Sequence, residues 1–314
     1  MTSMDRESQP VCSSRGPQTI RCAVIEGTQR LAAAGIDSAR LDAEVLMCHA
    51  LRVEKSHLYV SLDEHLEHSA RCRFGDFLIR RLRREPVAYI TGRQEFWSLD
   101  FLVTPEVLIP RPETERLVEI AVECAGAFGS DLPLRILDIG TGSGAIAVSL
   151  AKELPQAQVL AIDRSTAALE SARRNAACHG VADRVQLRAS DLFDKVGEHT
   201  FHLIVSNPPY VARGELAALA PEISQWEPRT ALDGGLDGFD YYRGIVAEGF
   251  RHLMPGGRLI MEIGAAMGRA VAELLSAAAN YTTPEIYQDY AGKDRVIVAH
   301  RLPAGMPTSA WSLS

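Results

Sequence analysis

Paired cysteines, metal-binding histidine patterns and long apolar runs are all missing from this sequence. Its six cysteines stand 10 to 54 residues apart with no C-x-x-C pair, which favours reduced thiols over a disulfide framework or a zinc site. The nine histidines include no H-E-x-x-H motif, so we expect no metal ion. The apolar run at residues 144–151 is far shorter than the roughly 20 residues that span a bilayer, so we expect no membrane association.

A secretory signal and an excess of positive charge are absent as well. The first twenty residues hold no apolar segment, and we expect a cytoplasmic protein. The net charge of −7 disfavours a dedicated nucleic-acid binder, because neutralising phosphates supplies most of the affinity of such proteins. With 314 residues, of which 46% are apolar and 23% charged, the chain is typical of a soluble globular protein of about two domains.

One segment departs from this acidic balance. Residues 71–93 carry seven arginines against two acidic residues. Such a run is usually a solvated helix face, and less often a contact for an acidic or ribonucleoprotein partner.

The pattern along the chain predicts five segments. Residues 1–17 are polar and without periodicity, and we expect a disordered tail there, with a second short tail at residues 303–314. Residues 18–86 show the apolar spacing of a small all-α domain, in which Leu41, Val45 and Leu46 would share one helix face. Aromatic and β-branched residues at 87–109 suggest a β-hairpin linker. Residues 110–302 would form the main domain.

Candidate strands alternate with candidate helices in this main domain. The predicted strands are Leu134–Ile139, Gln158–Ile162, Arg184–Arg188, Phe201–Ser206, Arg258–Ile263 and Arg295–His300. The predicted helices are Ala145–Leu154, Thr166–His179, Tyr241–Leu253 and Ala265–Ala279. This alternation is typical of an α/β protein with a doubly wound, mostly parallel sheet. One more strand at Pro284–Tyr290 would join the last strand through a short loop, which allows only antiparallel pairing.

A glycine-rich loop lies between the first of these strands and the first helix. It comprises Gly140, Thr141, Gly142, Ser143 and Gly144. Glycines let the backbone turn tightly and approach a ligand, and a helix N-terminus offers free N–H groups. The loop also satisfies the loose G-x-G-x-x-G/A pattern, so a nicotinamide enzyme stays open at this point.

Two further positions follow the next two strands. Asp163 would accept hydrogen bonds from the ribose of a bound nucleoside, either NAD or S-adenosylmethionine, or would simply cap the following helix. Leu192, after the third strand, would supply apolar contact to an adenine ring.

The tetrapeptide Asn207-Pro208-Pro209-Tyr210 follows the fourth strand directly. The first and fourth strands of a doubly wound sheet are neighbours, so this tetrapeptide and the glycine loop should face one cleft. The Asn207 amide oxygen and the Pro208 carbonyl can accept hydrogen bonds from a planar –NH2 group, and Tyr210 can stack on its flat face. Such a clamp orients a planar nitrogen toward a sulfonium methyl group, whereas hydride transfer needs no clamp.

The glycine loop, Asp163 and Asn207–Tyr210 together resemble the class I S-adenosylmethionine-dependent methyltransferases that act on amide or exocyclic nitrogens. The segments EPVAYITG (85–92), EFW (95–97) and LIPRPETE (108–115) are similar to those of protein glutamine methyltransferases. The segments EPRTALDGG (227–235) and GKDR (292–295) resemble the release-factor branch of that family. The resemblance implies a Rossmann-like seven-stranded sheet, mostly parallel with an antiparallel last pair, preceded by a small all-α domain.

The resemblance also implies a reaction. A methyl group would pass from S-adenosyl-L-methionine to the side-chain amide nitrogen (N5) of the glutamine in the Gly-Gly-Gln motif of peptide chain release factors. Gly140 to Gly144 would cradle the methionine part, Asp163 the ribose and Leu192 the adenine, with Asn207 touching co-substrate and glutamine. Asn207, Pro208 and Tyr210 would be the catalytic residues of the methyltransferase domain, and Asn207, Pro208, Pro209 and Tyr210 would bind the glutamine. The helical domain would recognise the release factor.

Three alternatives stay open. A glutamine methyltransferase acting on a ribosomal protein would share the clamp. A DNA adenine-N6 methyltransferase would need a basic groove and a target-recognition segment, which the acidic charge and the roughly 30 residues after Tyr210 disfavour. A cofactor-binding protein without catalysis would not need the Asn207 carboxamide. We expect a monomer that does not bind DNA directly.

Overall fold

The computed structural model describes residues 18–129 and 133–303. These residues divide into two compact units, one ending at Gly92 and the other beginning at Arg93. The division lies a few residues beyond the predicted boundary at residue 86. The tails predicted at residues 1–17 and 303–314 fall outside the described residues, except for Pro303.

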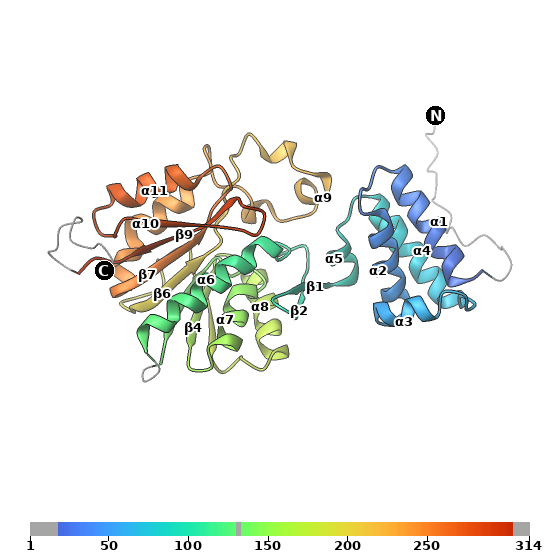
Figure 1. The fold of residues 1–314 in the computed structure, drawn as a ribbon, viewed down its shortest axis with the longest axis horizontal. Helices are drawn as coiled ribbons and strands as arrows, with labels where there is room; N and C mark the ends of the chain where they lie inside the picture. Colours follow the sequence, from blue (N-terminus) through green and yellow to red (C-terminus); the bar gives the residue numbers. More distant parts are fainter. Residues whose placement is uncertain (1–17, 130–132, 304–314) are drawn as a thin grey trace, which may run out of the picture. The chain divides into compact units, whose positions relative to one another are not determined.

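The first unit is helical (Figure 1). It contains α1 (Ile20–Ala33), α2 (Ala39–Leu51), α3 (Lys55–Val60), α4 (His68–Leu82) and α5 (Val87–Thr91). One apolar core joins them, with Leu31, Leu46 and Phe74 among its buried side chains. Leu41 is 52% exposed, so its predicted place on the apolar face is wrong. Five residues separate it from Leu46, which puts the two side chains about 140° apart around the helix.

The arginine-rich segment is largely bonded within the first unit. Arg81, only 5% exposed, pairs with Asp42 at 2.7 Å. Arg73 donates to a carbonyl oxygen near the end of α2, Arg84 donates to the carbonyl oxygens that follow α1, and Arg80 pairs with a buried glutamate. The carbonyl contacts satisfy groups that a helix end leaves unpaired. A solvated arginine face is therefore the wrong description of these four residues.

The linker predicted over residues 87–109 begins as a helix and not as a strand. Helix α5 follows Pro86 and ends at Gly92, whose φ is +73°. Proline at the start and glycine at the end are typical helix boundaries, and they outweigh the β-branched and aromatic residues between them. The hairpin itself comes next, in the second unit, where β1 (Arg93–Phe96) pairs antiparallel with β2 (Leu99–Leu102).

Within the described residues, the second unit contains a seven-stranded sheet in the order β5-β4-β3-β6-β7-β9-β8. Its strands are β3 (Arg135–Ile139), β4 (Gln158–Asp163), β5 (Val185–Ala189), β6 (Phe201–Ser206), β7 (Leu253–Glu262), β8 (Glu285–Gln288) and β9 (Asp294–His300). The first five pair in parallel, whereas β9 is antiparallel to both β7 and β8. The predicted sheet, mostly parallel with an antiparallel last pair, is confirmed.

Helices cover both faces of this sheet (Figure 1). They are α6 (Glu115–Ala125), α7 (Ala145–Glu153), α8 (Thr166–Cys178), α10 (Asp240–His252) and α11 (Gly268–Ala277). One apolar core lies under α6, α7 and α8, and a second lies under α10 and α11. Because both faces are covered, β6 is buried at every position, which is typical of a parallel strand inside a doubly wound sheet.

Short helical turns are also present in the second unit. They are η1 (Pro112–Thr114), η2 (Gly126–Phe128), η3 (Leu216–Ala218), α9 (Pro221–Ser224) and η4 (Arg229–Ala231). Three of these turns, η3, α9 and η4, lie in the segment between β6 and α10, at the edge of the sheet where the predicted site is found.

Candidate active site

The predicted site lies at the carboxyl ends of the central strands. Strand β3 has β4 on one side and β6 on the other, so the strand order reverses there, as at the ligand sites of doubly wound sheets. Ile139 lies opposite Ser206 in the register, and the Ser206 hydroxyl donates to the Ile139 carbonyl oxygen at 2.8 Å. The chain therefore enters the glycine loop and the tetrapeptide from neighbouring points.

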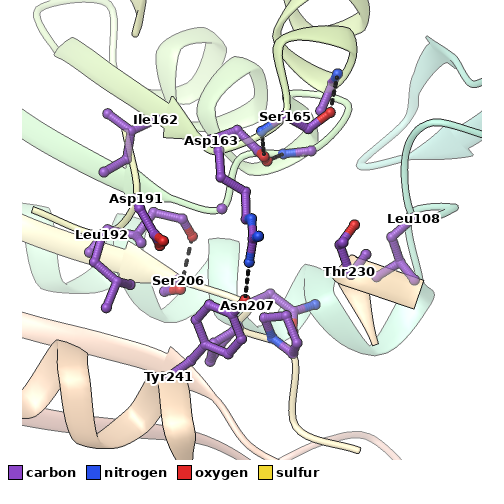
Figure 2. Close-up of a pocket in the computed structure, with 18 of the residues that line it drawn as sticks. Leu108, Ile162, Asp163, Ser165, Asp191, Leu192, Ser206, Asn207, Thr230 and Tyr241 are labelled. Atoms are coloured by element: carbon purple, nitrogen blue, oxygen red, sulfur yellow. Dashed lines mark hydrogen bonds between the residues drawn. The ribbon is translucent and has the colours of Figure 1, made fainter. Parts of the chain in front are cut away.

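A cavity of about 770 Å³, counted with its open mouth, lies at this place (Figure 2). Seven of the predicted site residues line it: Gly140, Gly142, Asp163, Leu192, Asn207, Pro208 and Pro209. Four others, Thr141, Ser143, Gly144 and Tyr210, are not part of this lining. The structure thus brings residues predicted to bind the co-substrate and residues predicted to bind the glutamine together in one cavity.

Gly140 and Gly142 form the open side of the glycine loop. Their φ angles are +74° and +55°, in the left-handed region that favours glycine. A Cβ at Gly140 would meet no atom within 4 Å, so the backbone at this point is accessible to a ligand.

Thr141, Ser143 and Gly144 support the loop from beneath. The Thr141 hydroxyl donates to Asp138 Oδ2 at 2.6 Å. The Ser143 carbonyl oxygen accepts a hydrogen bond from Asn175 Nδ2 at 2.8 Å. Gly144 has a φ of +82°, and a Cβ there would lie 3.1 Å from a side chain of α8. These residues therefore shape the loop without facing the cavity.

Asp163 joins the glycine loop to the end of β4. Its Oδ2 accepts from the Gly142 backbone N–H at 2.9 Å and its Oδ1 from that of Ser165 at 2.8 Å. Burial raises the pKa of Asp163, while these two backbone bonds lower it. The side chain that caps α8 is that of Ser165. Asp163 thus stands in the cavity wall, with carboxylate lone pairs left for further donors.

Leu192 and Ile162 give the cavity wall apolar surface, and the Asp191 carboxylate lies beside them (Figure 2). It has an unusual φ of +42°, and its carbonyl oxygen accepts from the Ser190 hydroxyl at 2.9 Å. Gly244 on α10 makes room for it, because a Cβ there would lie 2.5 Å from Leu192 Cδ1.

Arg164 and Tyr241 are cavity residues that sequence reasoning missed. Arg164 Nη1 donates to the Tyr241 hydroxyl at 3.2 Å, which connects the end of β4 to α10 across the lining. The position of Arg164 directly after Asp163 was the available signal. Tyr241 carried none, because its approach depends on how α10 packs on the sheet.

The side-chain amide of Asn207 is held by a residue far away in the sequence. Asn207 Nδ2 donates to Thr114 Oγ1 at 3.2 Å, and Thr114 Oγ1 donates to Glu262 Oε2 at 2.6 Å. One of the two amide N–H groups is therefore used inside the protein, and this bond fixes the orientation of the amide, whose oxygen stays available to accept a hydrogen bond from a ligand. Sequence reasoning gave no role to Thr114 or Glu262. An acidic residue at the end of an apolar strand was the signal for Glu262.

The backbone of the tetrapeptide is enclosed by the chain that follows it. A Cβ at Gly234 would lie 2.8 Å from the Pro209 carbonyl oxygen, and one at Gly238 would lie 2.5 Å from the Tyr210 carbonyl oxygen. The Tyr210 ring lies beside Gly264, where a Cβ would be 3.4 Å from it. Stacking of Tyr210 on a substrate amide stays a prediction.

The opposite wall comes from two segments that sequence analysis noted only for their resemblance. Leu108 begins the 108–115 segment and lines the cavity together with the two residues before it, and Pro228, Thr230 and Ala231 of the 227–235 segment line it as well. Figure 2 shows Leu108 and Thr230 on this side. An ion pair between Arg111 and Glu227 joins the two segments. Burial raises the pKa of Glu227, and the guanidinium of Arg111 lowers it. The pair fixes the position of this wall.

The chemistry of the cavity fits S-adenosylmethionine. Asp163 and Asp191 supply carboxylates, and Ile162 and Leu192 supply apolar surface. Asp138, fully buried under the glycine loop, has an Oδ1 with no hydrogen-bond partner among the described residues. Burial raises the pKa of Asp138 to about 7, and a cationic ligand nearby would favour its ionised form. The cavity can therefore hold a positively charged nucleoside beside the Asn207 amide.

Residues 18–129 and 133–303 lack two kinds of feature. No group of three or more His, Cys, Asp or Glu side chains suited to a metal ion occurs among them. None of their helices has both the length and the apolar character needed to cross a membrane.

Two family models match the chain. The PrmC N-terminal domain matches residues 23–92, which lie in the helical unit, and the Methyltransferase small domain matches residues 127–225. In structure, the catalytic domain of hMettl16, solved in complex with MAT2A 3′UTR hairpin 6, is similar with a TM-score of 0.53. It is 16% identical and covers 72% of this chain and 82% of that one, a likeness that concerns the fold alone.

Curated relatives match over nearly the whole chain. The release factor glutamine methyltransferase of Cereibacter sphaeroides is 48% identical over 92% of this chain and 99% of its own length. The protein of the same name from Geobacter sulfurreducens is 46% identical over 85% of this chain and 91% of its own. The chain is therefore a methyltransferase and belongs to the release factor glutamine methyltransferase family.

Proposed function

We propose that the protein methylates the side-chain amide nitrogen (N5) of the glutamine in the Gly-Gly-Gln motif of peptide chain release factors, with S-adenosyl-L-methionine as methyl donor. The orientation of Asn207 carries the proposal. Its amide nitrogen is bound to Thr114, so its oxygen faces an incoming –NH2 group beside a cavity suited to the donor. The names of the relatives from Cereibacter sphaeroides and Geobacter sulfurreducens support the same substrate.

The residues act mainly by orientation. The lone pair of an amide nitrogen is delocalised, so the nitrogen attacks poorly unless it is held in line with the methyl group. The Asn207 oxygen and the Pro208 carbonyl accept its N–H groups and stabilise the positive charge that develops there. S-Adenosylmethionine supplies the electrophilic methyl group. One S–CH3 bond breaks and its electron pair stays on sulfur, which becomes a neutral thioether. One N–CH3 bond forms, and one proton passes from the nitrogen to water.

The co-substrate would lie along the glycine loop. Gly140 and Gly142 would approach its methionine part, Asp163 would accept the ribose hydroxyls, and Leu192 would contact the adenine. Thr141, Ser143 and Gly144 would act indirectly, by holding the loop in shape. No metal ion takes part in this proposal.

The helical unit would recognise the release factor, and the enzyme would act as a monomer in the cytoplasm, in translation termination. Because Arg73, Arg80, Arg81 and Arg84 are bonded within that unit, recognition would rely on other residues of its surface. The two rival substrates, a ribosomal protein glutamine and adenine in DNA, have no observation in their favour here.

Transfer of labelled methyl from S-adenosylmethionine to purified acceptors tests the proposal. The acceptors are a release factor, the same factor with the glutamine of its Gly-Gly-Gln motif replaced, a ribosomal protein mixture and duplex DNA. Label on the intact release factor alone is the expected result. Label on ribosomal protein or DNA, or equal label on the altered release factor, would overturn the substrate.

A further inference from the structure

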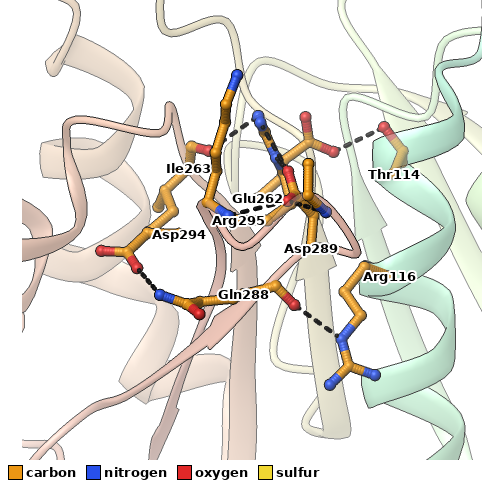
Figure 3. A network of polar contacts seen from close by, with 10 residues as sticks. Thr114, Arg116, Glu262, Ile263, Gln288, Asp289, Asp294 and Arg295 are labelled. Carbon is orange, nitrogen blue, oxygen red and sulfur yellow. Dashed lines mark hydrogen bonds and ion pairs between the residues drawn. The ribbon is translucent and has the colours of Figure 1, made fainter.

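Asn207 is the outer end of a chain of hydrogen bonds that leads away from the cavity. Thr114, on η1, is 5% exposed, and Glu262, at the end of β7, is 2% exposed. The Asn207–Thr114 bond measures 3.2 Å and the Thr114–Glu262 bond 2.6 Å. Figure 3 shows the inner part of this chain, with the Thr114 hydroxyl directed at the Glu262 carboxylate.

The direction of these bonds follows from what each group can donate. An ionised carboxylate only accepts hydrogen bonds, so the single hydroxyl proton of Thr114 goes to Glu262. Toward Asn207 the Thr114 oxygen can then only accept. A rotated Asn207 amide would place two acceptor oxygens face to face at the same distance, which is unfavourable.

We propose, given the glutamine methylation proposed above, that Thr114 and Glu262 are positioning residues that hold the Asn207 amide in the orientation presenting its oxygen to the substrate nitrogen. Neither residue touches the substrate. Their effect reaches the reaction through Asn207, because an amide turned the other way would offer N–H groups to the –NH2 group that it must bind.

Charged and titratable groups from several elements surround Glu262. They are Arg111 and Glu113 before α6, Tyr210 after β6, Tyr242 on α10 and Arg295 on β9. Arg295 is held in place by an ion pair with Asp289 at 3.2 Å (Figure 3). The positive charges of Arg295 and Arg111 favour the ionised carboxylate, whereas burial and Glu113 disfavour it.

This balance makes the positioning depend on pH. Burial raises the pKa of Glu262 to about 7. Above that pH the carboxylate is ionised, so Thr114 must donate to Glu262 and accept from Asn207. As pH falls through about 7, the protonated carboxyl can donate to Thr114, whose own proton is then free to turn toward Asn207. Turnover should therefore fall on the acid side of pH 7.

Substitution of Thr114 gives the first test. Thr114→Val keeps the shape but removes the hydroxyl, and should lower kcat about tenfold to a hundredfold with unchanged affinity for S-adenosylmethionine. Thr114→Ser should restore most of the loss. Tyr242→Phe is the matched control. It removes a buried hydroxyl that donates to the backbone carbonyl of Glu262 at 2.9 Å, but the hydrogen bonds from Asn207 through Thr114 to the Glu262 carboxylate remain. It should keep kcat near the wild-type value.

Two results of that series would overturn the proposal. One is wild-type kcat in Thr114→Val. The other is an equal loss of kcat in Tyr242→Phe, which would mean that any weakening near Glu262 has the same effect.

The pH profile gives the second test. Wild-type kcat should rise with pH through an apparent pKa of about 7. Glu262→Gln should be slow and without this acid limb. An unchanged acid limb in a folded Glu262→Gln variant would contradict the proposal.

A spectroscopic test separates this proposal from the proposed function. In 15N-labelled protein, one Asn207 side-chain N–H should be protected from exchange at pH 8 and lose that protection in Thr114→Val. This measurement needs no acceptor. A wild-type enzyme that labels no release factor would refute the function alone, whereas an Asn207 amide insensitive to Thr114→Val would refute the positioning.

Discussion

The two sides of the cavity are built in different ways. The co-substrate side comes from the ends of three consecutive strands, β3, β4 and β5. Backbone bonds hold it, because the N–H groups of Gly140 and Thr141 donate to the Ile162 carbonyl oxygen at 2.9 and 3.0 Å. The glutamine side is assembled from distant side chains, since 93 residues separate Asn207 from Thr114 and 148 separate Thr114 from Glu262. Damage to the first side should therefore weaken binding, and damage to the second should slow turnover.

The largest expected effect is on the glutamine side. Asn207→Ala removes the acceptor for the substrate nitrogen, and should lower kcat about 10²- to 10³-fold, as for other preorganised polar groups at reacting atoms. Affinity for S-adenosylmethionine, measured by calorimetry, should change little. A variant with wild-type turnover would show that the amide oxygen has no part in the reaction.

Asp163→Ala should have the next largest effect, on the co-substrate side. It removes the proposed ribose acceptor and two bonds to backbone N–H groups, and should raise the Kd for S-adenosylmethionine about tenfold to a hundredfold, which corresponds to roughly 1.4 to 2.7 kcal/mol. At saturating co-substrate, turnover should recover. Calorimetry that found an unchanged Kd would assign the ribose to another residue.

The co-substrate side could be predicted from sequence because its determinants are local. Glycines at fixed spacing after a strand, and an acid after the next strand, indicate both the turn and the ligand. The residues that hold Asn207 could not be found in this way. Met261 of β7 lies opposite Ser206 of β6, so Glu262 and Asn207 follow neighbouring strand ends, although more than 50 residues separate them in the sequence.

In two other segments, the preferences of individual residues predicted a different structure from the one that forms. Tyr89 and Ile90 favoured a strand, but Pro86 before the segment and Gly92 after it are typical helix boundaries, and the segment forms helix α5. The arginines of residues 71–93 had the composition of a solvated face, and their partners on other helices decided their role. The strands followed from the alternation of apolar runs with helical patterns, and the antiparallel pairing of β8 with β9 followed from the short loop between them.

Gly238→Ala should disturb the glutamine side through the backbone. Gly238 has a φ of +85°, and a Cβ there would lie 2.5 Å from the Tyr210 carbonyl oxygen. We expect a loss of about 1 to 3 kcal/mol in the free energy of unfolding, with a larger drop in kcat than in co-substrate affinity. Gly214→Ala is the control, because a Cβ at Gly214 would meet no atom within 4 Å. Equal effects of the two substitutions would contradict the close packing.

The buried carboxyl group of Asp138 makes stability depend on pH on the co-substrate side. Burial raises its pKa from the usual 3.8 to about 7, so between these values the folded state binds more protons than the unfolded state. Stability from this group is present at low pH and is lost as pH rises through 7. Relative to Asp138→Asn, wild-type protein should lose at most about 1.4 kcal/mol per pH unit in this range. Denaturant unfolding at pH 5 and pH 8 measures the difference, and parallel pH dependence of the two proteins would contradict the burial effect.

The smallest expected effect concerns the adenine position. Leu192→Ala removes a partly buried side chain, which at the usual value of apolar contacts should raise the Kd for S-adenosylmethionine by about tenfold or less. Turnover at saturation should stay as in the wild type. A loss of turnover at saturating S-adenosylmethionine would show that Leu192 affects the glutamine or the reaction instead of co-substrate binding.

Mass spectrometry of the reacted release factor tests the central claim most directly. After reaction with wild-type enzyme, we predict one methyl group on the side chain of the glutamine in the Gly-Gly-Gln motif, and about a hundredfold less methylation or lower at the same early time point with Asn207→Ala. A methyl group on any other residue, or equal methylation by Asn207→Ala, would contradict the account.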